Sequence, residues 1–132
     1  MLRRKRLPEG LREPFESFEA VAGSIDRAKE AITAAVPGTR LPGRPLAEAI
    51  LWFEEGLAEA KERMAAWRAS EVEEDWRACD EGMAEARRRA ERLRVEADAP
   101  VGFDGLVRAI GDLLQPLDAF EAAAERFRAL RS

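Results

Sequence analysis

Apolar residues recur at every third or fourth position along four long segments of the chain. This spacing puts them on one face of an α-helix, because each helical turn takes about 3.6 residues. Proline and glycine are concentrated between the segments, at 8–14, 37–45 and 98–105. The pattern predicts four helices, over about 14–36, 45–68, 70–98 and 103–131. No segment alternates apolar and polar residues with a period of two, so no β-sheet is expected.

Each predicted helix carries one apolar stripe, and the stripes together are expected to form the core. Their positions are Phe15, Phe18, Ala22, Ile25, Ile32 and Val36 in the first helix; Leu46, Ile50, Phe53, Leu57, Ala60, Met64 and Trp67 in the second; Val72, Trp76, Cys79, Met83, Ala86, Ala90, Leu93 and Ala97 in the third; and Phe103, Leu106, Ile110, Leu113, Leu117, Phe120, Ala124 and Phe127 in the fourth. Val21, Ala28 and Ala35 flank the first stripe. Lys29 interrupts it, and a lysine can lay its stem on the core while its ammonium stays in water.

The second and third helices are expected to form a tight hairpin at Arg68 to Ser70. Ser70 and Glu73 have the S-x-x-E spacing of a capping box, in which each side chain binds the backbone N–H of the other residue. Trp67 and Val72 are five positions apart, which breaks the apolar stripe. The alternative is one continuous helix over 45–98, and the broken stripe favours the hairpin.

Proline and glycine inside the predicted helices indicate where these helices bend or approach one another. Pro116 has no N–H to donate to the carbonyl of Asp112, so the fourth helix should bend there. Gly56 and Gly82 lie almost equally far from the hairpin and flank the stripes. This placement predicts a close approach of the second and third helices; a gap that admits a ligand is the alternative.

The helices are similar in length and their connections are short, which favours an all-α, up-down-up-down antiparallel four-helix bundle. Residues 14–132 would form this single domain, and residues 1–13 a flexible basic tail. A chain of 132 residues is long enough to bury a core without metals or disulfides.

Composition excludes some classes of partner and indicates the cellular compartment. The formal net charge is −4, so bulk attraction to nucleic acid or anionic lipid is not expected. The sequence contains no membrane-spanning run and no apolar signal-peptide core, and its single cysteine cannot form an intrachain disulfide. The count of 19 Arg against 3 Lys, with 25 Ala, is typical of a GC-rich genome. We therefore expect a bacterial, cytoplasmic protein without a membrane partner.

The residue types argue against catalysis. Histidine and tyrosine are absent from the sequence, which removes the commonest general base and metal ligand and the usual phenolic acid. The stripes contain no Asp or Glu for a metal site inside the bundle. Cys79 lies on a stripe and should be a small buried residue; a reactive thiol is the alternative, although the acids before it would raise its pKa. We expect no enzyme activity, no catalytic residue, no metal and no cofactor.

Charge is concentrated in a basic block at 1–13, an acidic block at 71–81 and an arginine block at 87–94. The bundle topology would let the basic tail fold onto the acidic start of the third helix. At the opposite end it would gather the candidate anion-binding residues Arg40, Arg44, Arg88, Arg92, Arg94 and Arg108. A phosphate, a nucleic-acid backbone or an acidic protein could bind there. The alternative is a solvated face whose charges complement the helix dipole.

Leu51 and Trp52 are predicted to point outward, opposite Ile50 and Phe53. An exposed Trp beside an exposed Leu is a candidate interface anchor, with Glu48 and Glu55 as its polar rim. The alternative is that a loop or the N-terminal tail, through Leu7 and Leu11, covers the pair. The sequence thus favours a non-catalytic bundle that acts through protein–protein interaction or homo-oligomerisation. The alternative is a protein that binds phosphate or nucleic acid through the basic tail and the arginine end.

Overall fold

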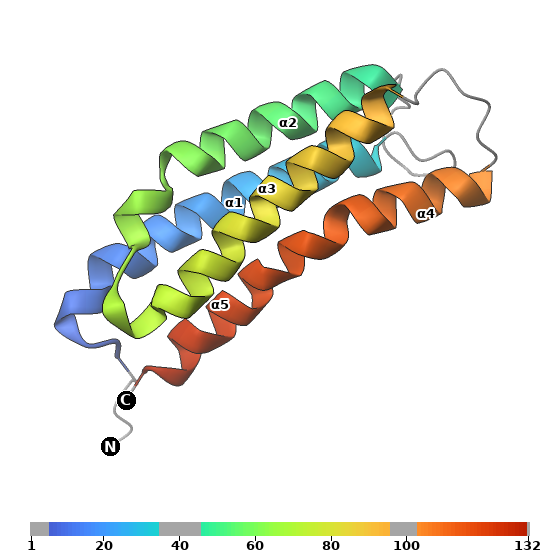
Figure 1. Cartoon of the computed structure of the whole chain (residues 1–132). Helices are drawn as coiled ribbons and strands as arrows, with labels where there is room; N and C mark the ends of the chain where they lie inside the picture. Colours follow the sequence, from blue (N-terminus) through green and yellow to red (C-terminus); the bar gives the residue numbers. More distant parts are fainter. Residues whose placement is uncertain (1–5, 35–45, 96–102, 132) are drawn as a thin grey trace.

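The structure is a computed structural model, which describes residues 6–34, 46–95 and 103–131. Nearly all of these residues are helical, and the described ranges contain no strand. Four helical rods pack side by side (Figure 1), so the predicted all-α four-helix bundle is confirmed.

The rods are built from nine helical segments within the described ranges. The first rod is η1 (Glu9–Leu11) and α1 (Arg12–Thr33), the second α2 (Leu46–Glu62) and η2 (Met64–Trp67), the third η3 (Ser70–Val72) and α3 (Glu73–Val95), and the fourth α4 (Phe103–Leu114), η4 (Gln115–Asp118) and α5 (Ala119–Ala129). Figure 1 places the η2–η3 connection, the start of α1 and the end of α5 together, which we call the hairpin end. The start of α2, the end of α3 and the start of α4 lie opposite, at what we call the distal end.

The predicted tail is shorter than residues 1–13. Leu11 is fully buried, and its N–H donates to the carbonyl of Pro8 at 2.9 Å in a 3₁₀ turn that leads directly into α1. Pro14 is accommodated because it lies in the first turn of α1, where no intrahelical N–H bond is lost. Residues 1–5 of the tail lie outside the described residues.

The core follows the predicted stripes with two shifts. In α1, Val21 and Ala28 are fully buried while Ala22 is half-buried. In α5, Ala123 takes the buried position predicted for Ala124. Phe120 and Phe127 are buried as predicted, and positions 123 and 124 lie on either side of the line that joins them, so a small rotation of α5 decides which alanine is buried. Val36, Ala35 and Ala97 lie outside the described residues.

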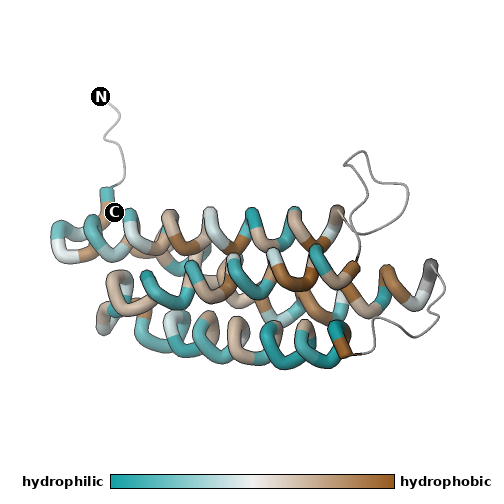
Figure 2. The backbone as a smooth tube through the Cα atoms, turned by 90° about the horizontal axis from the view of Figure 1, so that it is seen from above, coloured by the Kyte–Doolittle hydropathy of each residue, from teal (hydrophilic) through white to brown (hydrophobic). Residues whose placement is uncertain are grey.

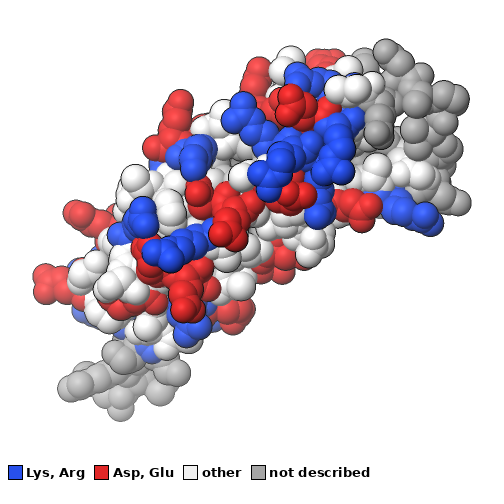
Figure 3. All heavy atoms as spheres, in the orientation of Figure 1, with Lys and Arg blue, Asp and Glu red and all other residues white. Residues whose placement is uncertain are grey.

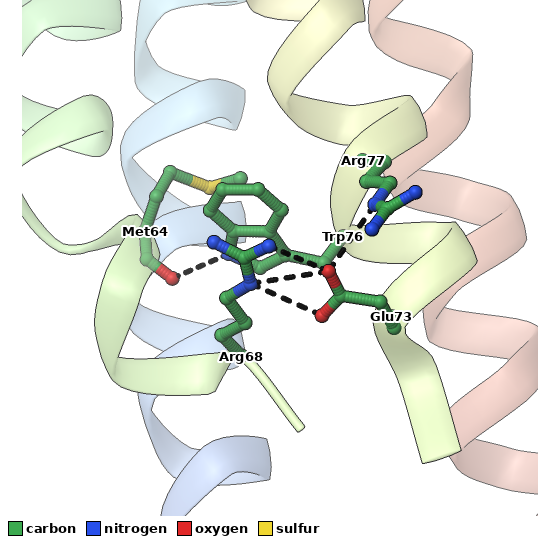
Figure 4. Close-up of polar contacts among 5 residues, drawn as sticks. All are labelled: Met64, Arg68, Glu73, Trp76 and Arg77. Atoms are coloured by element: carbon green, nitrogen blue, oxygen red, sulfur yellow. Dashed lines mark hydrogen bonds and ion pairs between the residues drawn. The ribbon is translucent and has the colours of Figure 1, made fainter. Parts of the chain in front are cut away.

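The predicted hairpin is confirmed and the continuous helix is wrong, because Arg68 and Ala69 are extended. The capping box is also wrong. Ala69, rather than Ser70, takes the N-cap position of η3, and the Ser70 hydroxyl donates to the carboxylate of Glu71. Figure 4 shows the connection that forms instead, in which the guanidinium of Arg68 donates to Glu73 at 2.7 Å and lies 4.3 Å over the ring of Trp76.

At Pro116, where a bend is predicted, the helix is interrupted: α4 ends at Leu114, and η4 separates it from α5. The carbonyl of Asp112, to which Pro116 cannot donate, accepts a hydrogen bond from Nη1 of Arg89 on α3 at 2.5 Å. A side chain from another rod therefore satisfies the group that the proline leaves unpaired.

The glycines bring together different helices from those predicted. A Cβ atom on Gly56 would lie 2.7 Å from Cβ of Ala28 on α1, and one on Gly82 would overlap the carbonyl oxygen of Pro116 in η4. The predicted approach of the second and third helices at these residues is thus wrong. A glycine beside the stripe indicates a close neighbour, but a helix in a bundle has two neighbours and the sequence pattern does not distinguish them.

Candidate functional site

The predicted interface residues lie on the outside of α2, near the distal end. Leu51 is 47% exposed and Trp52 is 46% exposed, and Glu48 and Glu55 beside them are exposed. The described N-terminal residues, from 6 onward, do not cover this pair, because the buried Leu11 leads into α1 at the hairpin end (Figure 1). That part of the alternative interpretation is wrong.

Two further apolar side chains at the distal end were missed from the sequence. Val95, the last residue of α3, is 78% exposed, and Val107 in the second turn of α4 is 43% exposed. With Leu51 and Trp52 they are the large apolar residues that the described part of the chain exposes, and all four lie towards one end. We call these four residues the distal apolar surface.

The position of α4 explains why part of this surface is exposed. Its start extends beyond the ends of α2 and α3 in Figure 1, and Figure 2 shows brown, hydrophobic stretches along this projecting part. Leu106 is half-buried and Val107 exposed, whereas Ile110, one turn later, is buried. Apolar residues at both 106 and 107 widen the stripe beyond what one neighbouring helix covers, which is the sequence signal that could have indicated Val107.

The arginine candidates are only partly brought together. Arg40 and Arg44 lie outside the described residues. Arg88, Arg92 and Arg94 lie on the distal half of α3, where Figure 3 shows a patch of basic side chains with acidic ones among them. Arg108 is exposed on α4.

Much of this positive charge is already paired. The carboxylate of Glu85 accepts from Nε of Arg88 at 2.9 Å and from Nε of Arg89 at 3.0 Å, and these two bonds hold its pKa below the usual range. Arg94 lies 3.6 Å from Oε1 of Glu54, a buried oxygen without a hydrogen bond. Anion binding by the arginines therefore stays a prediction, and an anion would meet carboxylates there.

The hollow between α3 and α4 illustrates this mixture of charges. It is lined by Glu85, Arg89, Arg92, Leu93, Ala109 and Asp112. Arg89 is already committed to Glu85 and to the carbonyl of Asp112. An anion here would meet two carboxylates beside the two guanidiniums.

The acidic start of α3 is neutralised by residues other than the tail. Glu73 pairs with Arg68 and Arg77, Asp75 with Arg126 at 3.3 Å, and Asp80 with Lys61. The bond from Arg68 is the largest cause of a lowered pKa at Glu73. In the described part of the tail, neither Arg6 nor Arg12 pairs with this block, so the predicted neutralisation by the tail is not seen there.

Cys79 is fully buried, as predicted. Burial, with the nearby charges of Asp75 and Asp80, raises the pKa of its thiol to about 12. The thiol therefore stays protonated at neutral pH and is not poised to act as a nucleophile.

Across the described ranges, no cluster of three or more potential metal ligands occurs, and no helix is long and apolar enough to span a membrane. Comparison with protein-family models, with curated proteins and with solved structures found no match to this chain.

Proposed function

We propose that the protein is a non-catalytic helical bundle that acts by binding a protein partner through the distal apolar surface. One observation carries the proposal: Leu51, Trp52, Val95 and Val107 come from three helices and are exposed at the same end. Scattered single apolar residues on a surface need no explanation, but exposed apolar residues gathered in one region are typical of interaction sites.

The residues around this surface suit an interface. Trp is enriched among the residues that contribute most to binding, because it removes a large apolar area from water. Glu48 and Glu55 flank Trp52 on the same helix and would form a polar rim that stays solvated.

The chemistry of the remaining chain supports a non-catalytic role. The sequence lacks histidine, and its one thiol is buried and protonated. The ion pairs on α3 resemble a stabilised helix surface rather than a catalytic constellation, since their partners are exposed and shared between neighbouring turns.

The proposal is tested by site-specific photo-crosslinking in cells that contain the natural partners. Benzoylphenylalanine replaces Trp52 in one variant and Ala66, an exposed residue near the hairpin end, in a matched control. We expect a discrete crosslinked product from position 52 and none from position 66. A product with twice the mass of the chain would identify the partner as a second copy.

Two outcomes would contradict the proposal. One is no product at position 52 above the level at position 66. The other is a product that persists unchanged when the interface is disrupted by Leu51→Glu.

A further inference from the structure

The exposed face of α3 has a charge pattern that is complementary to itself. Its hairpin half presents Glu74 and Glu81, and its distal half presents Arg88 and Arg92, all exposed. Ala84 lies between the two halves and is also exposed. Figure 3 shows basic side chains gathered over the distal half and acidic ones among the charges of the hairpin half.

These charges lie on one side of the helix. At about 100° per residue, the charged residues at 74, 77, 80, 81, 87, 88, 91 and 92 all fall within about 80° of the direction of Ala84. The face therefore runs the length of α3, with Ala84 near its centre.

Several of its charges have no ion-pair partner among the described residues. Arg77, Asp80 and Arg88 are paired with Glu73, Lys61 and Glu85. In contrast, Glu74, Glu81, Arg87, Glu91 and Arg92 take part in none of the ion pairs among the described residues.

We infer that this face binds a second copy of the chain, with the two α3 helices antiparallel and related by a two-fold axis near Ala84. Helix geometry then sets Glu81 of one copy beside Arg88 of the other, and Glu74 beside Arg92. The same operation sets Asp80 beside Arg87 and Arg77 beside Glu91. Each pairing joins opposite charges, occurs twice, and gives an ion-pair partner to at least one residue that has none in the described part of its own chain.

The surface next to α3 has the shape for such packing. A groove of about 380 Å³ runs between α2 and α3, with Leu57, Ala58, Met83 and Ala84 among its lining residues. Lys61, Asp80, Arg87, Arg88 and Glu91 line the rest of it. The small side chains at 58 and 84 allow the α3 ridge of the second copy to approach closely, while the charges surround the contact.

The extent of the face fits a dimer of ordinary size. The 23 residues of α3 span about 34 Å. The 17 residues of α2 beside it span about 26 Å, so at a width of about 10 Å for each helix the face offers on the order of 600 Å² per copy. Standard interfaces bury about 800 Å² on each partner.

Charge complementarity distinguishes a second copy from other partners. A uniformly acidic protein or a nucleic acid would be attracted to Arg88 and Arg92 but repelled by Glu74 and Glu81. Only a partner whose charge reverses along its length satisfies both halves, and the antiparallel second copy has this reversal.

The dimer also has one consequence for partner binding, and this consequence rests on the proposed function. Because the helices are antiparallel, Leu51 and Trp52 of the two copies lie at opposite ends of the dimer, whereas Val95, about 20° from the direction of Ala84, lies on the dimer face. The dimer would then hold two partner molecules apart. The self-association itself does not depend on Leu51 and Trp52.

The test uses two variants of the full chain, analysed by sedimentation equilibrium at low salt. One reverses the acidic half, Glu74→Arg with Glu81→Arg, and the other reverses the basic half, Arg88→Glu with Arg92→Glu. Each variant alone sets like charges against each other, so we expect its dimer affinity to fall at least about tenfold. Mixed in equal amounts, the two variants should form a heterodimer at least as tight as the parent dimer.

The control replaces two acids on another helix, Glu13→Arg with Glu16→Arg on α1. It changes the net charge by the same amount as the Glu74→Arg, Glu81→Arg variant. This control should leave the dimer affinity unchanged. Raising the salt concentration should weaken the parent dimer, because the pairs at its margin are screened.

The inference is overturned if the parent is monomeric at millimolar concentration and low salt, or if the mixed variants associate no better than each variant alone. Circular dichroism of each variant shows whether it is folded. If mixing rescues association, misfolding is excluded as the cause of the loss. Loss of crosslinking at position 52 with an intact dimer would count against the proposed function alone.

Discussion

The hairpin end and the distal end are both rich in apolar residues, but among the described residues the large apolar side chains at the hairpin end are buried or half-buried and several at the distal end are exposed. At the hairpin end the ring of Phe18 lies 5.0 Å from Trp67 and 5.1 Å from Phe127, and all three side chains are buried. At the distal end Trp52 is 46% exposed and Val95 is 78% exposed. The difference lies in how the rods meet, since aromatic residues from α1, η2 and α5 converge at one end while α4 projects past its neighbours at the other.

The polar groups of the tryptophans at the hairpin end are also bound within the protein. The indole N–H of Trp76 donates to the carbonyl of Met64 at 2.7 Å, so this tryptophan ties α3 to η2 (Figure 4). The indole N–H of Trp67 lies 3.2 Å from the sulfur of Met64. The tryptophans at the hairpin end therefore serve stability, whereas Trp52 is half-exposed, and we propose that it serves binding.

The sharpest contrast between the ends is expected from removing one tryptophan at each. Trp67→Ala should lower the free energy of unfolding by about 3–5 kcal/mol, because it leaves a cavity in the aromatic cluster. Trp52→Ala should cost less, about 1 kcal/mol, because about half of this side chain is already exposed in the folded protein. Urea denaturation followed by circular dichroism measures both values. Similar losses for the two variants would contradict this division of the molecule.

The next largest effect on the free energy of unfolding is expected where Gly82 on α3 contacts Pro116 in η4. Gly82→Ala should lower the free energy of unfolding by about 1–3 kcal/mol, because its Cβ would overlap the carbonyl of Pro116, and a backbone atom cannot rotate away. Gly111→Ala is the matched control in α4. Nothing lies within 4 Å of its Cβ position, so helix propensity should raise stability by about 0.5–1 kcal/mol. Thermal unfolding of both variants would show opposite shifts in Tm; a lower Tm for both would argue against the clash.

An effect confined to alkaline pH is expected from the buried thiol of Cys79. Its pKa is raised from 9.0 to about 12 in the folded protein, so above pH 9 the unfolded chain loses this proton while the folded chain keeps it. Stability therefore falls as the pH rises from about 9 towards 12, since the unfolded state binds fewer protons. Urea denaturation of the parent and of Cys79→Ala at several alkaline pH values separates the contribution of the thiol to the free energy of unfolding from that of the lysines. Parallel pH profiles for the two proteins would refute the raised pKa.

The four rods, the break at Pro116 and the burial of Cys79 could all be predicted, because each depends on the local repeat or on one residue's covalent structure. The outward direction of Leu51 and Trp52 follows from the same repeat. The adjacent apolar residues at 106 and 107 indicate a stripe too wide for one neighbour, but the extension of α4 beyond the other rods decides that Val107 is the exposed one. Leu11, assigned to the tail, is buried because the chain turns at Pro8 and returns it to the bundle.

The sequence alone determined which side of each helix is apolar, since that depends only on spacing along one chain segment. The tertiary structure decided which helix each side meets. Gly56 faces Ala28 rather than α3, Glu73 binds Arg68 rather than the N-terminus of its helix, and Arg89 donates to Asp112 on another rod. Hydrophobic periodicity is a local property and non-directional, whereas hydrogen bonds and close backbone contacts need particular partners in space. For that reason the pattern of residues identified the core, and only the packed bundle brought the exposed apolar residues to one end.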